Sequence, residues 1–354
     1  MQLAEIIKGI QPVEQGWIQK ARQRTAQLVM PTRALGRLHE IAERFCGIGQ
    51  TLEPAIKRKA ILVMAGDHGI VEEGVSAYPQ EVTPAMVRTF LAGGAGINAI
   101  SRQVGADVWV LDMGIIADLD ATGLKGADRL LVDKVGNGTA NFTRGPAMSR
   151  RQAEKAVLIG FEQASRLIEQ GADLLGTGDM GIGNTTPAAA VGSVLTGASL
   201  SQMVGRGTGV DDAGLARKRE VVRRGIAINH PDEQDGLDVL AKVGGFEIGG
   251  IAGLILAGAF RRRAVVIDGF ISTAGALIAA AMSPRVKDYL FAGHCSVEPG
   301  HRVMLKHLGL DPLLDLGMRL GEGTGAALAM SVMESAVRVF KEVLTFEEAG
   351  VANK

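Results

Sequence analysis

Residues 173–187 read DLLGTGDMGIGNTTP and contain the pattern that decides the fold. The run Asp173–Gly176 has the length and apolar character of a buried strand, glycines follow it, and a helical pattern opens at Pro187. An apolar run leads into a glycine-containing loop at three other places, Ala60–Ala65, Val108–Met113 and Ala264–Ile267. Longer helical patterns lie between these runs. Strands that alternate with helices predict a parallel sheet covered on both faces, with ligands bound outside the carboxyl ends of its strands.

The two ends of the chain have a different pattern. The first part shows no buried strand and predicts three helices, Leu3–Ile10, Gly16–Leu28 and Leu35–Phe45. The last part predicts one long helix, Ala326–Val343, which can rejoin the N-terminal helices. We therefore expect a small helical domain of residues 1–55 and 326–354 beside an α/β domain of residues 56–325.

The composition limits the classes of protein that need consideration. The chain has 354 residues, 47% of them hydrophobic, which is enough for a large buried core. Its 38 basic and 38 acidic residues balance, so we expect neither nucleic acid nor a membrane as a partner. The apolar residues 248–260 are too few to span a bilayer. The chain start does not resemble a signal peptide, and two cysteines suit a reducing compartment, so we expect a cytoplasmic protein.

The glycine-rich segment 176–187 allows more than one interpretation. Its glycines match the G-x-G-x-x-G pattern of dinucleotide-binding proteins, but no acidic residue follows about twenty positions later to bind a ribose hydroxyl. This argues against a nicotinamide-dependent dehydrogenase. Free N–H groups near Gly181, with Asn184 and Thr185 at the start of the next helix, favour a bound anion. A capped helix start without a ligand is the simpler alternative.

A second glycine-rich loop, residues 204–218, contains Gly205 and Gly207 and ends at Lys218, which has an arginine on each side. One of these three cations can reach a phosphate, although a solvated basic face is the more common outcome. Asp268 directly follows the fourth strand candidate. An acid at that place can accept hydrogen bonds from ribose hydroxyls or cap the following helix.

Three further features of the sequence invite chemical interpretation. Residues 293–301, GHCSVEPGH, contain potential metal ligands, but their spacing matches no usual zinc pattern, so we expect no metal and no cofactor. Glu322 stands between two glycines just before a long apolar helix. The glycines let another molecule approach its carboxylate, which favours a catalytic role over a charge at a helix start. His68 follows Asp67, and fixing a loop is a more common role for it than acid–base chemistry.

Several segments, in a consistent order, resemble one known family. They are AGDHGIVEEGVSAYP (65–79), GIGNTTPAAA (181–190), KVGGFEIGG (242–250), VIDGF (266–270) and MRLGEGTGAALAM (318–330). On these motifs, the chain from about residue 25 to residue 340 resembles the nicotinate-nucleotide–dimethylbenzimidazole phosphoribosyltransferases of cobalamin biosynthesis. The resemblance implies a doubly wound α/β domain, a small helical domain built from both chain ends, and a homodimer.

The resemblance also implies a reaction and the residues that carry it. A ring nitrogen of dimethylbenzimidazole attacks C1′ of nicotinate mononucleotide, nicotinate leaves, and α-ribazole phosphate forms. The catalytic base of the family falls on Glu322, and its second active-site acid falls on Asp179, which is one methylene shorter than the glutamate of some members. Lys218, Asp268 and Ser296 match substrate-binding positions of the family.

The pocket for the acceptor base differs from that of some relatives. Where certain members have a serine and a glutamine, this chain has Tyr78 and Met86, which still suit a planar ring. The same donor with another acceptor, such as adenine, another benzimidazole or a phenol, is therefore an alternative function. A nucleotide-binding regulator without catalytic activity is a further alternative, but it gives Glu322 no reason to stand between glycines.

Overall fold

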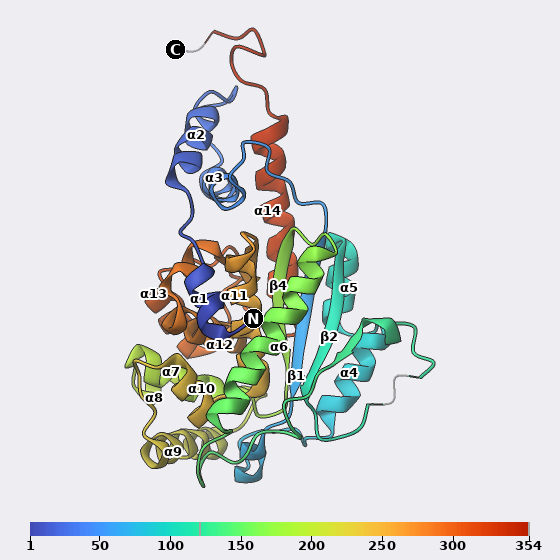
Figure 1. Ribbon diagram of the computed structural model, residues 1–354, viewed down its shortest axis with the longest axis vertical. Helices are drawn as coiled ribbons and strands as arrows, with labels where there is room; N and C mark the ends of the chain where they lie inside the picture. Colours follow the sequence, from blue (N-terminus) through green and yellow to red (C-terminus); the bar gives the residue numbers. More distant parts are fainter. Residues whose placement is uncertain (120–121, 353–354) are drawn as a thin grey trace.

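The centre of the molecule is a six-stranded parallel sheet with the strand order β3-β2-β1-β4-β5-β6 (Figure 1). The computed structural model describes residues 1–119 and 122–352. The strands are β1 (Lys59–Gly66), β2 (Ala106–Gly114), β3 (Leu130–Val132), β4 (Leu174–Met180), β5 (Ala264–Ile267) and β6 (Leu290–Ala292). The order runs outward in both directions from β1 and β4, so the sheet is doubly wound. This confirms the predicted α/β fold class.

The four predicted strands are present, with one correction. β4 continues past Gly176 to Met180, so Gly178 and Asp179 lie on the strand and not in the loop that the sequence pattern indicated. Glycine is needed at positions 176 and 178 of this strand because the neighbouring atoms leave no room for a side chain. At Gly178, a Cβ would lie 2.6 Å from the backbone oxygen of Glu322. The three-residue strands β3 and β6 were not predicted, because so short a run carries no recognisable pattern.

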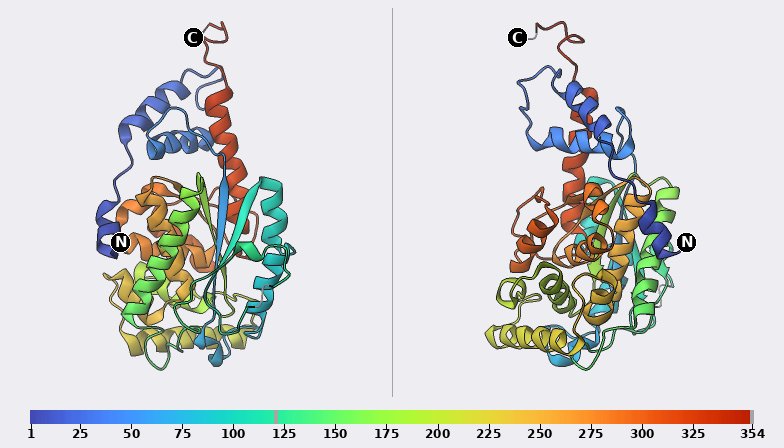
Figure 2. Two further views of the ribbon diagram at one scale, coloured as in Figure 1. Left: turned by 45° about the vertical axis from the view of Figure 1, so that its right-hand side comes forward. Right: turned by 60° about the vertical axis from the view of Figure 1, so that its left-hand side comes forward.

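Helices cover both faces of the sheet (Figure 2). One face carries α11 (Phe246–Phe260), with α6 (Arg150–Glu169) packed on it. The other carries α4 (Val82–Ala92), α5 (Gly96–Val104) and α14 (Thr324–Glu342). The alternation of side chains along β1 agrees with this, since Met64 lies against α11 and Ile61 lies beside the start of α14. α6 begins with a capping box, in which Ser149 and Gln152 hydrogen-bond to each other's backbone N–H groups.

A group of helices continues the layer around α11. It contains α7 (Thr185–Thr196), α8 (Leu200–Met203), α9 (Asp212–Asn229), α10 (Gly236–Val243), α12 (Phe270–Met282) and α13 (Pro299–Leu308). α12 packs on α11, and α7, α10 and α13 pack on α12. These helices hold the loops that follow β4 and β5.

Both chain ends contribute to a helical region away from the sheet. α2 (Gln15–Thr25) and α3 (Arg37–Gly49) lie beside the far end of α14, where Arg24 donates a hydrogen bond to the Phe340 carbonyl (Figures 1 and 2). α1 (Leu3–Gly9) packs instead on α11, with Gly9 against the ring of Phe260. The exact division into two domains stays a prediction. In the described part of the chain, no helix combines the length and apolar character that crossing a membrane requires.

Candidate active site

A cavity of about 490 Å³ opens among the loops at the carboxyl edge of the sheet. Most of the predicted site residues line it, namely Tyr78, Met86, Asp179, Gly181, Asn184, Thr185, Gly207, Ser296 and Glu322. The three others, Gly205, Lys218 and Asp268, lie behind this lining. Gly205 lies beside Glu298, Lys218 hydrogen-bonds Thr185, and Asp268 hydrogen-bonds Gly323. Doubly wound sheets bind their ligands at this edge, so the location agrees with the fold.

Glu322 adopts a backbone conformation that few residues other than glycine accept. Its φ is 62°, between Gly321 at 80° and Gly323 at 92°. Such a conformation costs on the order of 1–3 kcal/mol and often marks a functional site. The Glu322 carboxylate accepts a hydrogen bond from the backbone N–H of Ile97 (3.1 Å), at the start of α5. Burial raises the pKa of Glu322 above its usual value, and the Ile97 N–H opposes this increase.

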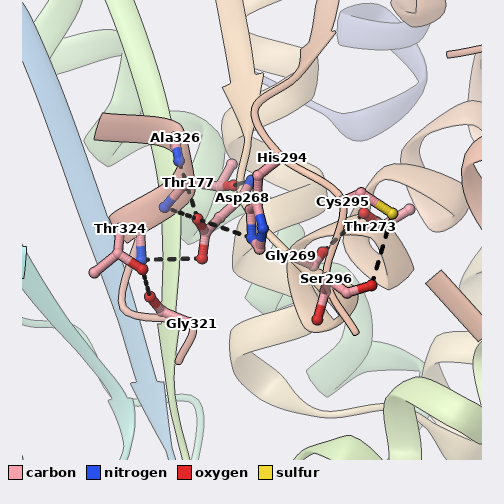
Figure 3. A network of polar contacts seen from close by, with 12 residues as sticks. Thr177, Asp268, Gly269, Thr273, His294, Cys295, Ser296, Gly321, Thr324 and Ala326 are labelled. Atoms are coloured by element: carbon pink, nitrogen blue, oxygen red, sulfur yellow. Dashed lines mark hydrogen bonds and ion pairs between the residues drawn. The ribbon is translucent and has the colours of Figure 1, made fainter. Parts of the chain in front are cut away.

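Asp268 fixes the loop that carries Glu322. It follows β5, and its carboxylate accepts hydrogen bonds from the N–H groups of Gly323 (3.2 Å), Gly325 (2.7 Å) and Ala326 (3.0 Å), as Figure 3 shows for part of this network. Gly323 at the N-cap of α14 has no side chain, so Asp268 caps the helix in its place. The sequence allowed for a capping role on the following helix, but the helix that is capped is α14.

Asp179 lies at the end of β4 and is almost fully buried. One carboxylate oxygen accepts a hydrogen bond from the amide of Asn184 (2.9 Å), and the other has no hydrogen-bond partner among the described residues. Burial, followed by the negative charge of Asp268, raises the pKa of Asp179 to about 8. Asp179 is therefore mostly protonated at neutral pH, and its unpartnered oxygen can donate a hydrogen bond into the cavity.

Lys218 is the cation of the second glycine-rich loop that turns inward. Its side chain is buried and donates to Oγ1 of Thr185 (2.7 Å), whereas the neighbouring Arg217 is exposed and contacts the Gly74 carbonyl. A Cβ on Gly207, whose φ is 55°, would lie 2.9 Å from the Lys218 ammonium, so Lys218 lies directly behind this glycine. Burial lowers the pKa of Lys218 to about 8, against the opposing effect of Glu298.

Glu298 is a cavity residue that the sequence interpretation did not single out. It accepts a hydrogen bond from the Gly207 N–H (2.9 Å), and its second oxygen, directed at Gly205, has no hydrogen-bond partner within the described residues. Glu298 thus holds the loop that places Lys218 behind the cavity wall. The sequence motif 293–301 contains Glu298, but from the sequence alone the motif indicates only a possible metal ligand.

Hydrogen bonds hold the 293–301 segment in place. The Ser296 N–H donates to Nδ1 of His301 (2.8 Å), and Nε2 of His301 lies 2.9 Å from Oγ1 of Thr273, whose hydroxyl donates to the Gly269 carbonyl. Burial lowers the pKa of His301 to about 3, so this ring is neutral. Across residues 1–119 and 122–352, no group of three or more His, Cys, Asp or Glu side chains is arranged to bind a metal ion.

His68 lies outside the cavity lining, beneath the loop after β4. Its Nε2 is 3.1 Å from Oε1 of Glu247 at the start of α11, and both side chains are buried. Burial alone would lower the pKa of His68, but the Glu247 carboxylate raises it above its usual value. A Cβ at Gly181 would lie 3.1 Å from His68 Nε2, so this pair supports the loop that lines the cavity.

One side of the cavity is more apolar than the rest. Tyr78 is 54% exposed at the mouth, and Met86 projects from α4. Phe270, Ile271 and Leu320 also contribute to the lining. The cavity therefore combines a polar end around Thr185 and Gly207 with apolar walls suited to a flat ring.

The comparisons with known proteins identify this fold as that of a phosphoribosyltransferase. A family model described as a phosphoribosyltransferase matches residues 10–351. A nicotinate-nucleotide–dimethylbenzimidazole phosphoribosyltransferase from Geotalea uraniireducens is 52% identical over 350 residues, covering 99% of this chain and 98% of the relative. A protein of the same name from Desulforudis audaxviator is also 52% identical, with the same coverage.

A solved structure agrees with these relatives. The nicotinate-nucleotide–dimethylbenzimidazole phosphoribosyltransferase from Thermus thermophilus superposes with a TM-score of 0.90 at 48% identity, covering 96% of this chain and all of that one. The chain belongs to the family of nicotinate-nucleotide–dimethylbenzimidazole phosphoribosyltransferases.

Proposed function

We propose that this enzyme transfers the 5-phosphoribosyl group of nicotinate mononucleotide to dimethylbenzimidazole, forming α-ribazole phosphate and nicotinate. The observation that carries this proposal is Glu322, a carboxylate held at the cavity wall in a costly backbone conformation. Its raised pKa makes it a better base than an ordinary glutamate. The names of the relatives supply the substrates.

The polar end of the cavity suits the phosphate of the donor. Thr185 stands in the first turn of α7, where free backbone N–H groups favour an anion. Lys218, hydrogen-bonded to Thr185, supplies a positive charge at the same place. We assign Gly181, Asn184, Gly205 and Gly207 to the backbone that surrounds the phosphate, and Asp268 and Ser296 to the ribose side.

The chemistry needs a base but no electrophilic catalyst. A ring nitrogen of the acceptor forms a bond to C1′ as the C1′–N bond to the pyridinium breaks, and the electron pair goes to the nicotinate ring nitrogen. Glu322 takes the proton from the other ring nitrogen of the acceptor. Asp179, protonated near neutral pH, donates a hydrogen bond and does not compete as the base. Binding the phosphate away from C1′ supplies energy for orienting the reacting atoms.

We further propose a place for the enzyme in cobalamin biosynthesis, in the cytoplasm, as a homodimer. No metal or cofactor is needed in this scheme, since the leaving group already carries its activating positive charge. Activity that disappears on exhaustive chelation and returns with one specific divalent ion would contradict this part of the proposal.

The test is incubation with nicotinate mononucleotide and a panel of bases, with mass analysis of the products. We expect the phosphoribosyl adduct of dimethylbenzimidazole together with adducts of other planar bases. Tyr78 and Met86 offer apolar contact, and such contact discriminates one methyl group by only about 1–3 kcal/mol. If adenine or a phenol reacts and dimethylbenzimidazole does not, the alternative acceptor is correct. If no base reacts, the proposed function is wrong.

A further inference from the structure

His294 lies on the cavity wall, yet the reaction described above gives it no role. The residue is only 1% exposed, and neither ring nitrogen has a hydrogen-bond partner among the residues that the structure describes. Buried polar groups in folded proteins almost always have a partner, because leaving one unpaired costs free energy. An imidazole that lines a cavity in this state is ready to bind a group of the ligand.

The surroundings of His294 prevent its ring from turning to find a partner elsewhere. The ring lies between Gly269 and Gly325, and a Cβ at Gly325 would overlap it. The adjacent backbone is held on both sides, because the Gly293 N–H donates to the Ile267 carbonyl (2.8 Å) and the Cys295 N–H to the Leu314 carbonyl (2.7 Å). The position of the imidazole is therefore fixed before any ligand binds.

His294 lies near residues that belong to both ends of the cavity. Four residues further along the chain, Glu298 holds Gly207 at the polar end proposed for the phosphate. On its other side, the ring contacts Gly325, three residues after Glu322. In the donor nucleotide, the ribose joins the phosphate to the reacting C1′, so the group nearest to His294 would be the sugar.

We propose that a ring nitrogen of His294 hydrogen-bonds a ribose hydroxyl of the phosphoribosyl donor. This proposal rests on the proposed function. Nε2 of His294 lies 3.8 Å from Oδ1 of Asp268, too far for a direct hydrogen bond (Figure 3). Asp268 already accepts three backbone N–H groups at the start of α14, so His294 is the group of this pair that lacks a hydrogen-bond partner among the described residues. A ribose hydroxyl can accept a hydrogen bond from the imidazole or donate one to it.

The experiment combines a variant with altered donors. Turnover of wild type and His294→Ala is measured with nicotinate mononucleotide and with its 2′-deoxy and 3′-deoxy analogues, all with dimethylbenzimidazole. We expect His294→Ala to lower kcat/KM for the natural donor by about 10- to 100-fold, the effect of leaving a buried polar group unpaired. One deoxy analogue should show a similar loss with wild type and little further loss with the variant. His307→Ala, at an exposed position on α13, is the matched control and should behave as wild type.

The remaining outcomes separate the possible failures. If the losses from the variant and from both deoxy analogues multiply, His294 acts only by packing, and the proposal is wrong. The proposal is also wrong if non-additivity appears with nicotinamide mononucleotide, which lacks the donor carboxylate, and not with a deoxy sugar. A circular-dichroism melting curve for each variant identifies a loss that comes from misfolding, and His294→Asn then provides a smaller change. Absence of turnover by wild type with every donor and base would instead refute the proposed function.

Discussion

Glycine serves opposite purposes in two regions of this molecule. Where α6 crosses α11, a Cβ at Gly253 would overlap the carbonyl oxygen of Val157, and one at Gly160 would overlap that of Gly250. These glycines have ordinary helical backbones and allow two helices to approach closely. At the carboxyl edge of the sheet, Gly321 and Gly323 have positive φ values and give Glu322 its position. The close contact of α6 and α11 stabilises the fold, whereas the strained backbone at Glu322 lowers the stability of the fold and positions a functional side chain.

The largest effect should come from removing the charge of Glu322. Glu322→Gln keeps the side-chain shape and can still accept the Ile97 N–H, but it cannot take a proton. General-base catalysis contributes about 10²–10⁴-fold, so turnover should fall by that factor while the Michaelis constant for the donor stays close to wild type. The loss should shrink with acceptors of lower pKa. Steady-state kinetics with several benzimidazoles measures both effects.

Glu342→Gln at the exposed far end of the same helix is the control for this experiment. A Glu322→Gln enzyme that keeps more than about a third of wild-type turnover would reduce Glu322 to a charge at a helix start. The base would then be sought at Asp179, with the double variant as the deciding measurement.

The second effect concerns the helix crossing. Gly253→Ala must separate α6 from α11, because backbone atoms that cannot move alone occupy the space of the new methyl group. Overpacking of this kind typically costs about 1–3 kcal/mol and sometimes more. Urea unfolding should show the loss, while the activity of the folded fraction changes little.

Gly16→Ala provides the matched control. Gly16 lies near the start of α2 with nothing within 4 Å of the added Cβ, so this substitution should stabilise the protein by roughly 0.4–1 kcal/mol. Equal effects of the two substitutions would show that the contact between α6 and α11 is not the cause.

The third effect isolates the positive charge at the polar end of the cavity. Lys218→Ala should raise the Michaelis constant for nicotinate mononucleotide, since a charge-assisted hydrogen bond to phosphate is worth about 1.5–3 kcal/mol. The affinity for the acceptor base should change much less. Arg217→Ala removes an adjacent but exposed cation and serves as the control. An unchanged donor Michaelis constant for Lys218→Ala would shift the assignment to Arg206 or Arg219.

The sequence could predict the sheet and the edge at which the cavity lies, because these depend on local patterns. The four longer strands lead into glycine-containing loops, and the carboxyl ends of parallel strands meet at one edge. The roles of His294 and Glu298 could not be predicted in this way. Both depend on contacts with Gly325 and Gly207, which lie in other segments of the chain, so their motif alone raised only the question of a metal site.

The last effect is a pH dependence that comes from Asp179. Its pKa is about 8 in the folded protein, well above the usual value near 4 for an unfolded chain. Below pH 4 both states hold the proton, whereas between pH 4 and 8 only the folded state holds it. Stability from this group is thus fully present at low pH and is lost as pH rises through 8, with a slope of at most about 1.4 kcal/mol per pH unit.

Asp179→Asn removes this titration while its side-chain oxygen can still accept from Asn184. We expect the stability of wild type, measured by urea unfolding from pH 5 to 8, to fall relative to that of the variant as pH rises. Burial also raises the pKa values of Glu322 and Asp268, so both proteins should retain some slope of the same sign, and the difference between their curves isolates Asp179. Parallel curves would mean that Asp179 is ionised throughout this range, and it would then compete with Glu322 as the base of the reaction.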